Sequence, residues 1–188
     1  IRSSSTPSSA KPFSPCAPGS RIEVFGGSAP PPVLPQRAMD ITFSDIAVDG
    51  EHLVDLSEEL LAPWSWLPLP GGAVVVAASK VGDLFFEDGE GVVYRLDTHL
   101  GLIDRIADNE QAFFEGLEDN LVPWFRCVVV FQAREIGAKL EGMSVFALGK
   151  PVALGGEFDL ENLVHTDLKT HVYFQAEFLR KLAELPPG

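Results

Sequence analysis

The chain has 188 residues, 46% of them hydrophobic, and carries 27 acidic against 14 basic side chains for a formal net charge of −13. This excess of acid argues against nucleic acid as a partner, and it favours either a basic protein partner or simple solubility. The sequence has no run of about 18 apolar residues and no apolar N-terminal segment, so we expect neither a membrane span nor a secretory signal. Cys16 and Cys127 stand far apart in unlike contexts, which fits a reducing, cytoplasmic compartment.

Residues 1–38 differ in composition from the rest of the chain. Eight Ser, eight Pro and three Gly make up 19 of these 38 residues, and their net charge of +3 leaves −16 for residues 39–188. A segment so poor in apolar residues is predicted to be disordered. Met39 resembles a natural start, so we interpret the tail as an expression remnant or read-through, with a polyproline ligand at residues 30–32 as the alternative. Residues 39–188 are then one folded domain.

The first elements after the tail are short. Residues 40–47 are compatible with a strand, and residues 55–61 predict a helix with acidic residues in its first turn, which Pro63 ends. Trp64 and Trp66 are two positions apart and point to the same side of an extended segment. We expect these indoles to cap the core, although a stacking platform for a ligand has the same pattern.

The centre of the chain predicts a meander of four antiparallel strands. Residues 73–78 are apolar and β-branched, as in a central strand. Two further apolar runs, residues 84–86 and 92–96, flank the Asp88-Gly89 pair, which is a strong signal for a hairpin turn. Residues 102–107 predict the fourth strand.

The second half of the chain predicts three helices and two strands. Asp108 is expected to cap a helix that contains Phe113, and Pro123 to open the next one. We interpret residues 124–140 as a buried helix, although Cys127–Phe131 has strand propensity. Strands are predicted at residues 143–148 and 160–166, with a loop around Gly155-Gly156 between them.

The last predicted helix, residues 167–184, has the clearest amphipathic pattern. Its apolar positions fill an arc of about 160° on a helical wheel, and they are Leu168, Val172, Phe174, Phe178, Leu179, Leu182 and Leu185. His171 and Gln175 fall inside this arc. We therefore expect His171 to be buried against the sheet and hydrogen-bonded, either to Asp167 or to a backbone carbonyl. The alternative is a catalytic carboxylate–imidazole pair formed by Asp167 and His171.

Two acidic clusters are the candidate partner-binding sites. One lies at the hairpin tip, which projects beyond the sheet and is the preferred candidate. The other would line one face of a strand, where it could bind a divalent cation or be a solvated surface. No nucleophile motif, phosphate loop or metal-ligand spacing accompanies them, so we expect no enzyme activity, cofactor or metal. The candidate residues are Glu87, Asp88 and Glu90 at the tip and Glu157, Asp159 and Glu161 in the second cluster.

Short motifs between Trp64 and Gly188, taken in their order and spacing, resemble the C-terminal domain of type VI secretion DNase-immunity proteins. That domain is similar in character to SUKH-like immunity folds. The resemblance covers about residues 64–188, and its most specific part is Leu154-Gly155-Gly156-Glu157-Phe158 followed by Asn162. The matching residues that we expect to be structural are Trp64, Trp66, Gly82, Asp83, Phe85, Gly91, Asp97, Gly155, Gly156, Asn162, Asp167 and His171.

The resemblance implies an immunity protein, a non-enzymatic antitoxin that binds a cognate toxin inside the producing cell during bacterial competition. Family members often carry an additional N-terminal domain, but only residues 40–63 stand in its place here, so the toxin need not be a DNase. Two other functions remain compatible with the sequence: a small enzyme using Asp167 and His171 or the second acidic cluster, and an adaptor for another basic protein. For the fold we expect an α+β domain with an antiparallel meander and helices packed on one face.

If residues 1–38 contribute nothing to the core, a chain that begins at Met39 should unfold at the same temperature as the full chain. Thermal unfolding followed by circular dichroism measures this. A midpoint lowered by more than a few degrees would show that the tail packs against the domain.

Overall fold

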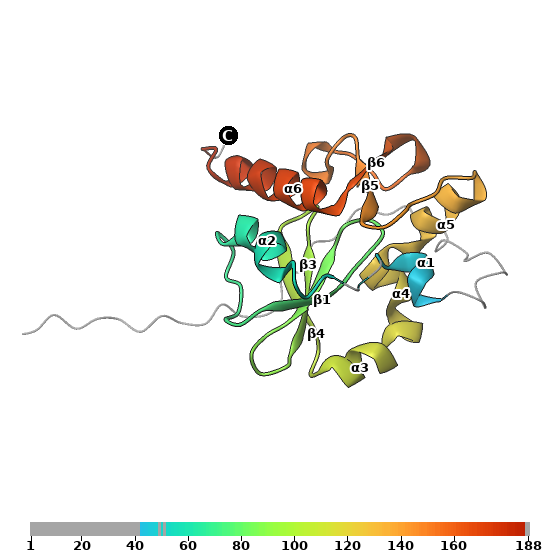
Figure 1. Cartoon of the computed structure of the whole chain (residues 1–188). Coiled ribbons are helices and arrows are strands. Elements are labelled where there is room, and N and C mark those ends of the chain that lie inside the picture. The colour runs from blue at the N-terminus through green and yellow to red at the C-terminus, as the bar shows by residue number, and fades with distance from the viewer. Residues whose placement is uncertain (1–41, 49, 51, 187–188) are drawn as a thin grey trace, which may run out of the picture. The chain divides into compact units, whose positions relative to one another are not determined.

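The computed structural model describes residues 42–48, 50 and 52–186 (Figure 1). The predicted tail, with Cys16 and Met39, lies outside the described residues. Among the helices that the structure describes, none is both long and apolar enough to cross a bilayer.

The first half of the described chain forms the predicted meander. Its strands β1 to β4 lie in the order β1-β2-β3-β4, with every neighbouring pair antiparallel. The β2–β3 hairpin pairs Leu84 with Leu96 and Phe86 with Tyr94, and in its turn the Gly91 amide donates to the Asp88 carbonyl at 3.0 Å. The elements are α1 (Phe43–Ile46), α2 (Ser57–Leu61), η2 (Ala62–Trp64), β1 (Val74–Ala78), β2 (Leu84–Glu87), β3 (Val93–Asp97) and β4 (Leu102–Ala107).

The second half forms four α-helices, two short 3-10 helices (labelled η, as is η2 above) and a small antiparallel sheet of two strands, β5 and β6. The backbone amide of Phe146 in β5 donates to the carbonyl of Lys80 at 2.8 Å, which joins this small sheet to the turn after β1. The elements are α3 (Glu110–Glu115), α4 (Leu117–Phe125), α5 (Cys127–Glu135), β5 (Ser144–Leu148), η3 (Val152–Leu154), η4 (Leu160–Asn162), β6 (Leu163–Asp167) and α6 (Leu168–Ala183).

Both faces of the four-stranded sheet are covered by helices. Leu84 and Phe86 of β2 pack with α2 and α6, whereas Phe85 between them packs with Phe113 and Phe125 of α3 and α4. Figure 1 shows α2 and α6 together on one side and α3 and α4 on the other. The α+β class and the meander are thus confirmed, but the expectation that helices cover one face is wrong. Successive residues of a strand point to opposite faces, so three consecutive buried residues require cover on both.

Three local predictions are corrected. Residues 43–46 form helix α1 rather than a strand, because the Asp45 carboxylate accepts a hydrogen bond from the Thr42 amide at 2.9 Å. Strand β1 lies at the edge of the sheet rather than in its centre. The N-cap of α3 is Asn109, one residue after the predicted Asp108, and its side chain accepts from the Ala112 amide.

The predicted helix over residues 124–140 is divided in two. Pro123 does not open it but lies inside α4, which ends where Arg126 adopts a left-handed conformation with φ 49°. Helix α5 then begins at Cys127, whose thiol is buried in the core. A non-glycine residue in this conformation is uncommon and has to be held by its surroundings.

Candidate functional site

The acidic tip of the β2–β3 hairpin is shaped by Asp88. Its carboxylate accepts hydrogen bonds from the amides of Glu90 at 2.9 Å and Val92 at 3.0 Å, and from the Tyr94 hydroxyl at 3.2 Å. Partial burial raises the pKa of Asp88, but these hydrogen bonds, that of Val92 foremost, outweigh it and hold the pKa below its usual value. Asp88 therefore serves the turn, and the tip presents to solvent an exposed Glu90 and a half-buried Glu87.

The second acidic cluster lies in a loop rather than on a strand. Asp159 caps the short helix η4 by accepting from the Asn162 amide at 2.8 Å, so strand β6 begins only at Leu163. Glu157, Asp159 and Glu161 are all exposed, and they still surround one shallow hollow of about 320 Å³. In the described part of the chain, no three His, Cys, Asp or Glu side chains are arranged to hold a metal ion. The cluster is an acidic surface.

The Gly155-Gly156 motif and Asn162 build the loop that carries this cluster. The Asn162 side chain donates to the carbonyls of Lys150 at 3.0 Å and Glu157 at 2.9 Å, and it accepts from the Lys150 amide at 2.7 Å. Gly155 has φ 81°, and a Cβ on Gly156 would lie 1.7 Å from the Lys150 carbonyl oxygen. These residues are therefore required by the backbone path.

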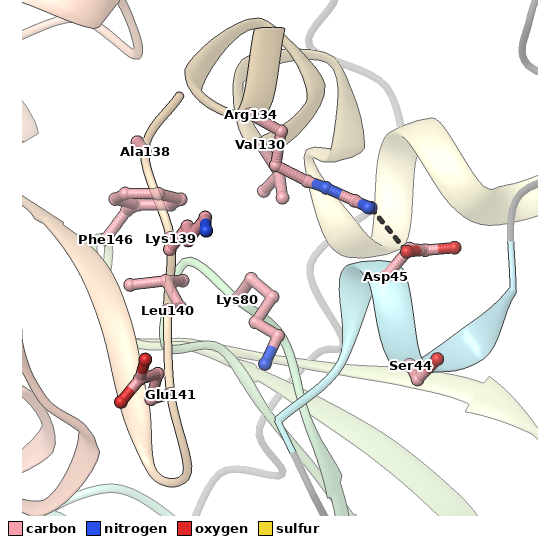
Figure 2. A pocket seen from close by; sticks show the side chains of 10 residues that line it. All are labelled: Ser44, Asp45, Lys80, Val130, Arg134, Ala138, Lys139, Leu140, Glu141 and Phe146. Atoms are coloured by element: carbon pink, nitrogen blue, oxygen red, sulfur yellow. Dashed lines mark hydrogen bonds and ion pairs between the residues drawn. The ribbon is translucent and has the colours of Figure 1, made fainter. Parts of the chain in front are cut away.

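A pocket of about 290 Å³ opens between α1, α5 and the segment that leads into β5 (Figure 2). Apolar side chains, Val130 and Phe146 among them, share its lining with charged residues of both signs. The Arg134 guanidinium forms an ion pair with Asp45 across its rim. This pocket could not be predicted from sequence patterns, because its lining comes from distant segments. The charged residues that line it are Asp45, Lys80, Arg134, Lys139 and Glu141.

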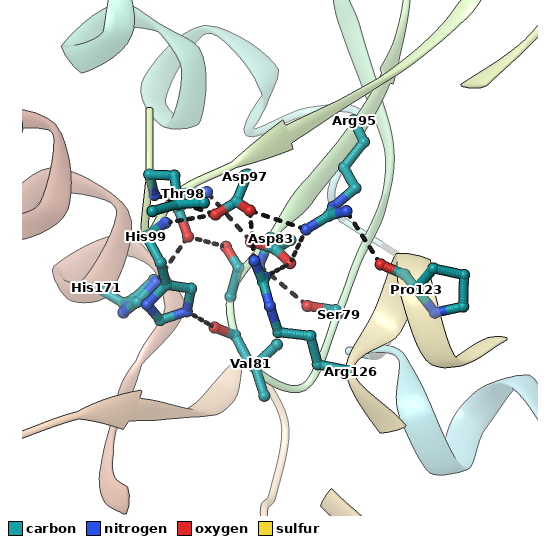
Figure 3. A network of polar contacts seen from close by, with 12 residues as sticks. Ser79, Val81, Asp83, Arg95, Asp97, Thr98, His99, Pro123, Arg126 and His171 are labelled. Atoms are coloured by element: carbon teal, nitrogen blue, oxygen red, sulfur yellow. Dashed lines mark hydrogen bonds and ion pairs between the residues drawn. The ribbon is translucent and has the colours of Figure 1, made fainter. Parts of the chain in front are cut away.

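Four charged side chains meet under the sheet, where β2, β3 and the α4–α5 junction converge (Figure 3). Arg95 donates to Asp83 at 3.3 Å and to Asp97 at 3.0 Å, and Arg126 forms ion pairs with both carboxylates. Asp83 is fully buried and Asp97 is 4% exposed. Burial raises the pKa of Asp83, while the nearby Arg126 charge opposes that rise. Two guanidinium groups facing two carboxylates make the ionised network neutral overall.

Backbone groups contribute hydrogen bonds to the network as well, although the buried Nε of Arg95 has no partner among the described residues. The Thr98 amide donates to Asp83 at 3.2 Å, and the His99 amide donates to Asp97 at 3.0 Å. Arg95 also donates to the Pro123 carbonyl at 3.0 Å, a group left over at the end of α4. Such a buried cluster organises the fold, and it is too enclosed to meet a partner directly.

His171 is buried beside this network, at 2% exposure. Its Nε2 lies 3.0 Å from the Thr98 hydroxyl, and its ring lies 5.0 Å from that of His99. Asp167 instead caps α6 by accepting from the amides of Lys169 at 3.0 Å and Thr170 at 3.2 Å. Burial, and to a lesser extent the His99 charge, lowers the pKa of His171 to about 3, so the ring is neutral at physiological pH. The suggested catalytic pair is therefore not assembled.

Comparison with known proteins bears on this geometry. Residues 107–178 match the family model described as T6SS immunity protein Tdi1, C-terminal. The type VI secretion immunity family is thereby confirmed for this segment. A search of curated proteins finds no match to the chain.

The matched segment, residues 107–178, contains some of the motif residues that carry the resemblance. Gly155, Gly156, Asn162, Asp167 and His171 lie inside the match, and the seven motif residues from Trp64 to Asp97 precede it. Those earlier residues are nonetheless built into the same core. Trp64 is fully buried and stacks on Trp66 at 6.0 Å between ring centroids, and Phe85 stacks on Phe125 at 4.5 Å.

Two network residues, Arg95 and Arg126, were missed in the sequence. A signal was present, because Asp83 and Asp97 adjoin predicted buried strands and a buried carboxylate needs a cationic partner. The partner could not be chosen by spacing, since Arg126 lies 43 residues from Asp83 and reaches it only through the break between α4 and α5.

Gly82 and His171 test how tightly this region is packed. Gly82 has φ 90°, and a Cβ there would lie 2.3 Å from Cδ2 of His171. Gly82→Ala should therefore lower the free energy of unfolding by about 2–4 kcal/mol, from backbone strain and overlap together. In a denaturant double-mutant cycle, His171→Ala should relieve the overlap but not the strain. Strictly additive losses would contradict the contact.

His171 also predicts a pH dependence. The unfolded chain takes up a proton at this ring below about pH 6.5, whereas the folded chain does so only near pH 3. The free energy of unfolding should therefore fall as the pH drops through this window, by about 2 kcal/mol from this group between pH 7 and pH 5. Urea unfolding at several pH values measures the slope. His171→Ala should flatten it, and replacing the exposed His165 by Ala should not; equal slopes in all three proteins would contradict the assignment.

Proposed function

We propose that this chain is an immunity protein that binds a toxic type VI secretion effector inside the cell that makes it, and neutralises it by covering its surface. The observation that carries this proposal is the match of residues 107–178 to the immunity family. The family is described by immunity and not by the activity of a toxin, so the proposal does not depend on what the toxin does. A nuclease is the first candidate, because its basic substrate groove complements an acidic inhibitor.

A mechanism without chemistry agrees with where the reactive groups lie. The carboxylates of Asp83 and Asp97 are enclosed with their arginine partners, and His171 is buried and neutral. The exposed carboxylates of the second cluster surround a shallow hollow with no histidine or cysteine in its lining. Inhibition would then be steric, because the bound immunity protein would exclude the toxin's substrate from the surface of the toxin.

The acidic clusters would guide the toxin to its inhibitor. Residues 39–188 carry a net charge of −16, and charges at an interface rim act mainly on the rate of association. The loop cluster offers three exposed carboxylates, while the hairpin tip offers Glu87 and Glu90, since Asp88 is engaged in the turn. Both surfaces are proposed as contacts, and they can be tested separately.

Co-expression with the toxic domain of a candidate type VI effector, sought among the genes next to this one, tests the function itself. Cells that express the toxic domain alone should stop growing, and this chain should restore growth and co-purify with the domain. Continued growth arrest despite soluble expression of the chain would contradict an immunity role. Protection without a stable complex would point to an enzyme acting on the toxin or its product.

The steering role predicts a kinetic effect. One variant reverses the exposed Glu157 and Glu161 to Lys, and another reverses the half-buried Glu87 and the exposed Glu90. Each should slow association with the inactivated toxic domain by about tenfold or more at low salt. The effect should shrink at high salt because exposed charges are then screened. Biosensor kinetics at two ionic strengths measure both quantities.

The matched control reverses two exposed acids elsewhere, Asp104 in β4 and Glu118 in α4, with the same change in net charge. If both cluster variants behave like this control, the acidity acts only through total charge or solubility, and neither cluster is a contact.

A further inference from the structure

Helix α6 is apolar over a wider arc than the sheet covers. Leu168, Val172 and Leu179 are buried in the core, as the helical pattern predicts. Phe174 lies within the same predicted arc, yet it is 55% exposed. We define the α6 strip as three exposed or half-buried apolar residues at the edge of this arc and just beyond the helix end, Phe174, Phe178 and Leu185, together with Tyr173, which lies outside the arc but beside Phe174.

The strip is held in place before any partner binds. The rings of Phe174 and Phe178 are stacked, with centroids 6.0 Å apart and planes 2° from parallel. Phe178 in turn packs against the core. Tyr173 and Phe174 also line a shallow hollow of about 660 Å³ between α6 and Glu59 of α2. Rigid aromatic side chains next to a hollow lose little conformational entropy on binding.

The charges around the strip cancel one another. Lys169 forms an ion pair with Glu59 at 2.8 Å, and Arg180 pairs with Glu177 at 2.8 Å and with Glu184 at 3.4 Å. Together with Lys181, three acids face three bases here, in a domain whose net charge is −16. A basic surface would therefore be attracted more strongly to the acidic clusters than to this neutral region. An apolar surface that docks here does not approach a region of high net negative charge.

We propose that the α6 strip is the main docking surface for the toxin, and that its occupant is an uncharged, apolar patch of the toxin with one side chain inserted into the hollow between α2 and α6. This inference rests on the proposed immunity function. Aromatic residues dominate the energetic centres of protein interfaces, while charges cluster at the rim. The acidic clusters would set how fast the toxin arrives, and the α6 strip how slowly it leaves.

Single alanine substitutions of Phe174 and Tyr173 test the proposal. Alanine has the highest helix propensity, so each variant should keep α6 folded. The probe is the same candidate toxic domain as in the co-expression test, inactivated and captured on a biosensor surface. We expect each variant to dissociate at least about tenfold faster than the unaltered chain, with an association rate and salt dependence that are nearly unchanged.

The matched control is Ile136→Ala, which removes an apolar side chain that is 70% exposed at the end of α5. If the unaltered chain does not bind the probe, the proposed immunity function fails and this inference fails with it. If the unaltered chain binds and both α6 variants dissociate as slowly as the control, the docking surface lies elsewhere while the immunity function stands. If light scattering shows a dimer that Phe174→Ala converts to a monomer, the strip joins two copies of this chain, and the proposal is overturned.

Discussion

The ion pairs of Asp83 and Asp97 with Arg95 and Arg126 are the constraint on which the rest of the structure depends. They connect neighbouring strands of the meander to the point where α4 gives way to α5. Removing one partner from such a group leaves a buried charge without compensation. This lowers the free energy of unfolding by much more than the loss of a surface ion pair does. The left-handed conformation of Arg126 coincides with this network, because the chain breaks between α4 and α5 at the residue whose guanidinium reaches both carboxylates.

This arrangement separates the polar groups of the molecule into two populations. The polar groups with the strongest mutual interactions are buried and stabilise the fold, as in the contact of His171 with Thr98 beside Gly82. Those at the surface, above all the carboxylates around the β5–β6 loop, face water on a backbone fixed by Asn162. A protein that acts by covering another needs this division, because its surface has to keep one shape while nothing on it reacts.

Much of the fold could be predicted because its signals are local. The Asp88-Gly89 signal locates the hairpin between two apolar runs. Its loop is longer than a two-residue turn, and Gly91, at φ 83°, leads the chain into the register that places Phe86 opposite Tyr94. The cover on both faces was missed although the run Leu84–Phe86 implies it, since alternation alone cannot say which helices supply the second layer. The second acidic cluster was gathered as expected, but by a capped loop instead of a strand. Pairing of residues far apart in the chain, as for Arg126 and Asp83, depends on packing that no local pattern encodes.

In helix α6, the sequence pattern predicts which residues share a side, but not which of them are buried. The helical period identifies which residues share a side, but the width of the neighbouring elements decides how many of them are buried. Here α2 and the sheet cover Leu168, Val172 and Leu179 and leave Phe174 outside. Electrostatic attraction acts over roughly 10 Å at moderate salt and so operates before contact, whereas apolar burial acts only once the surfaces touch. In the proposed complex, the acidic surface would therefore attract a basic toxin and the α6 strip would retain it.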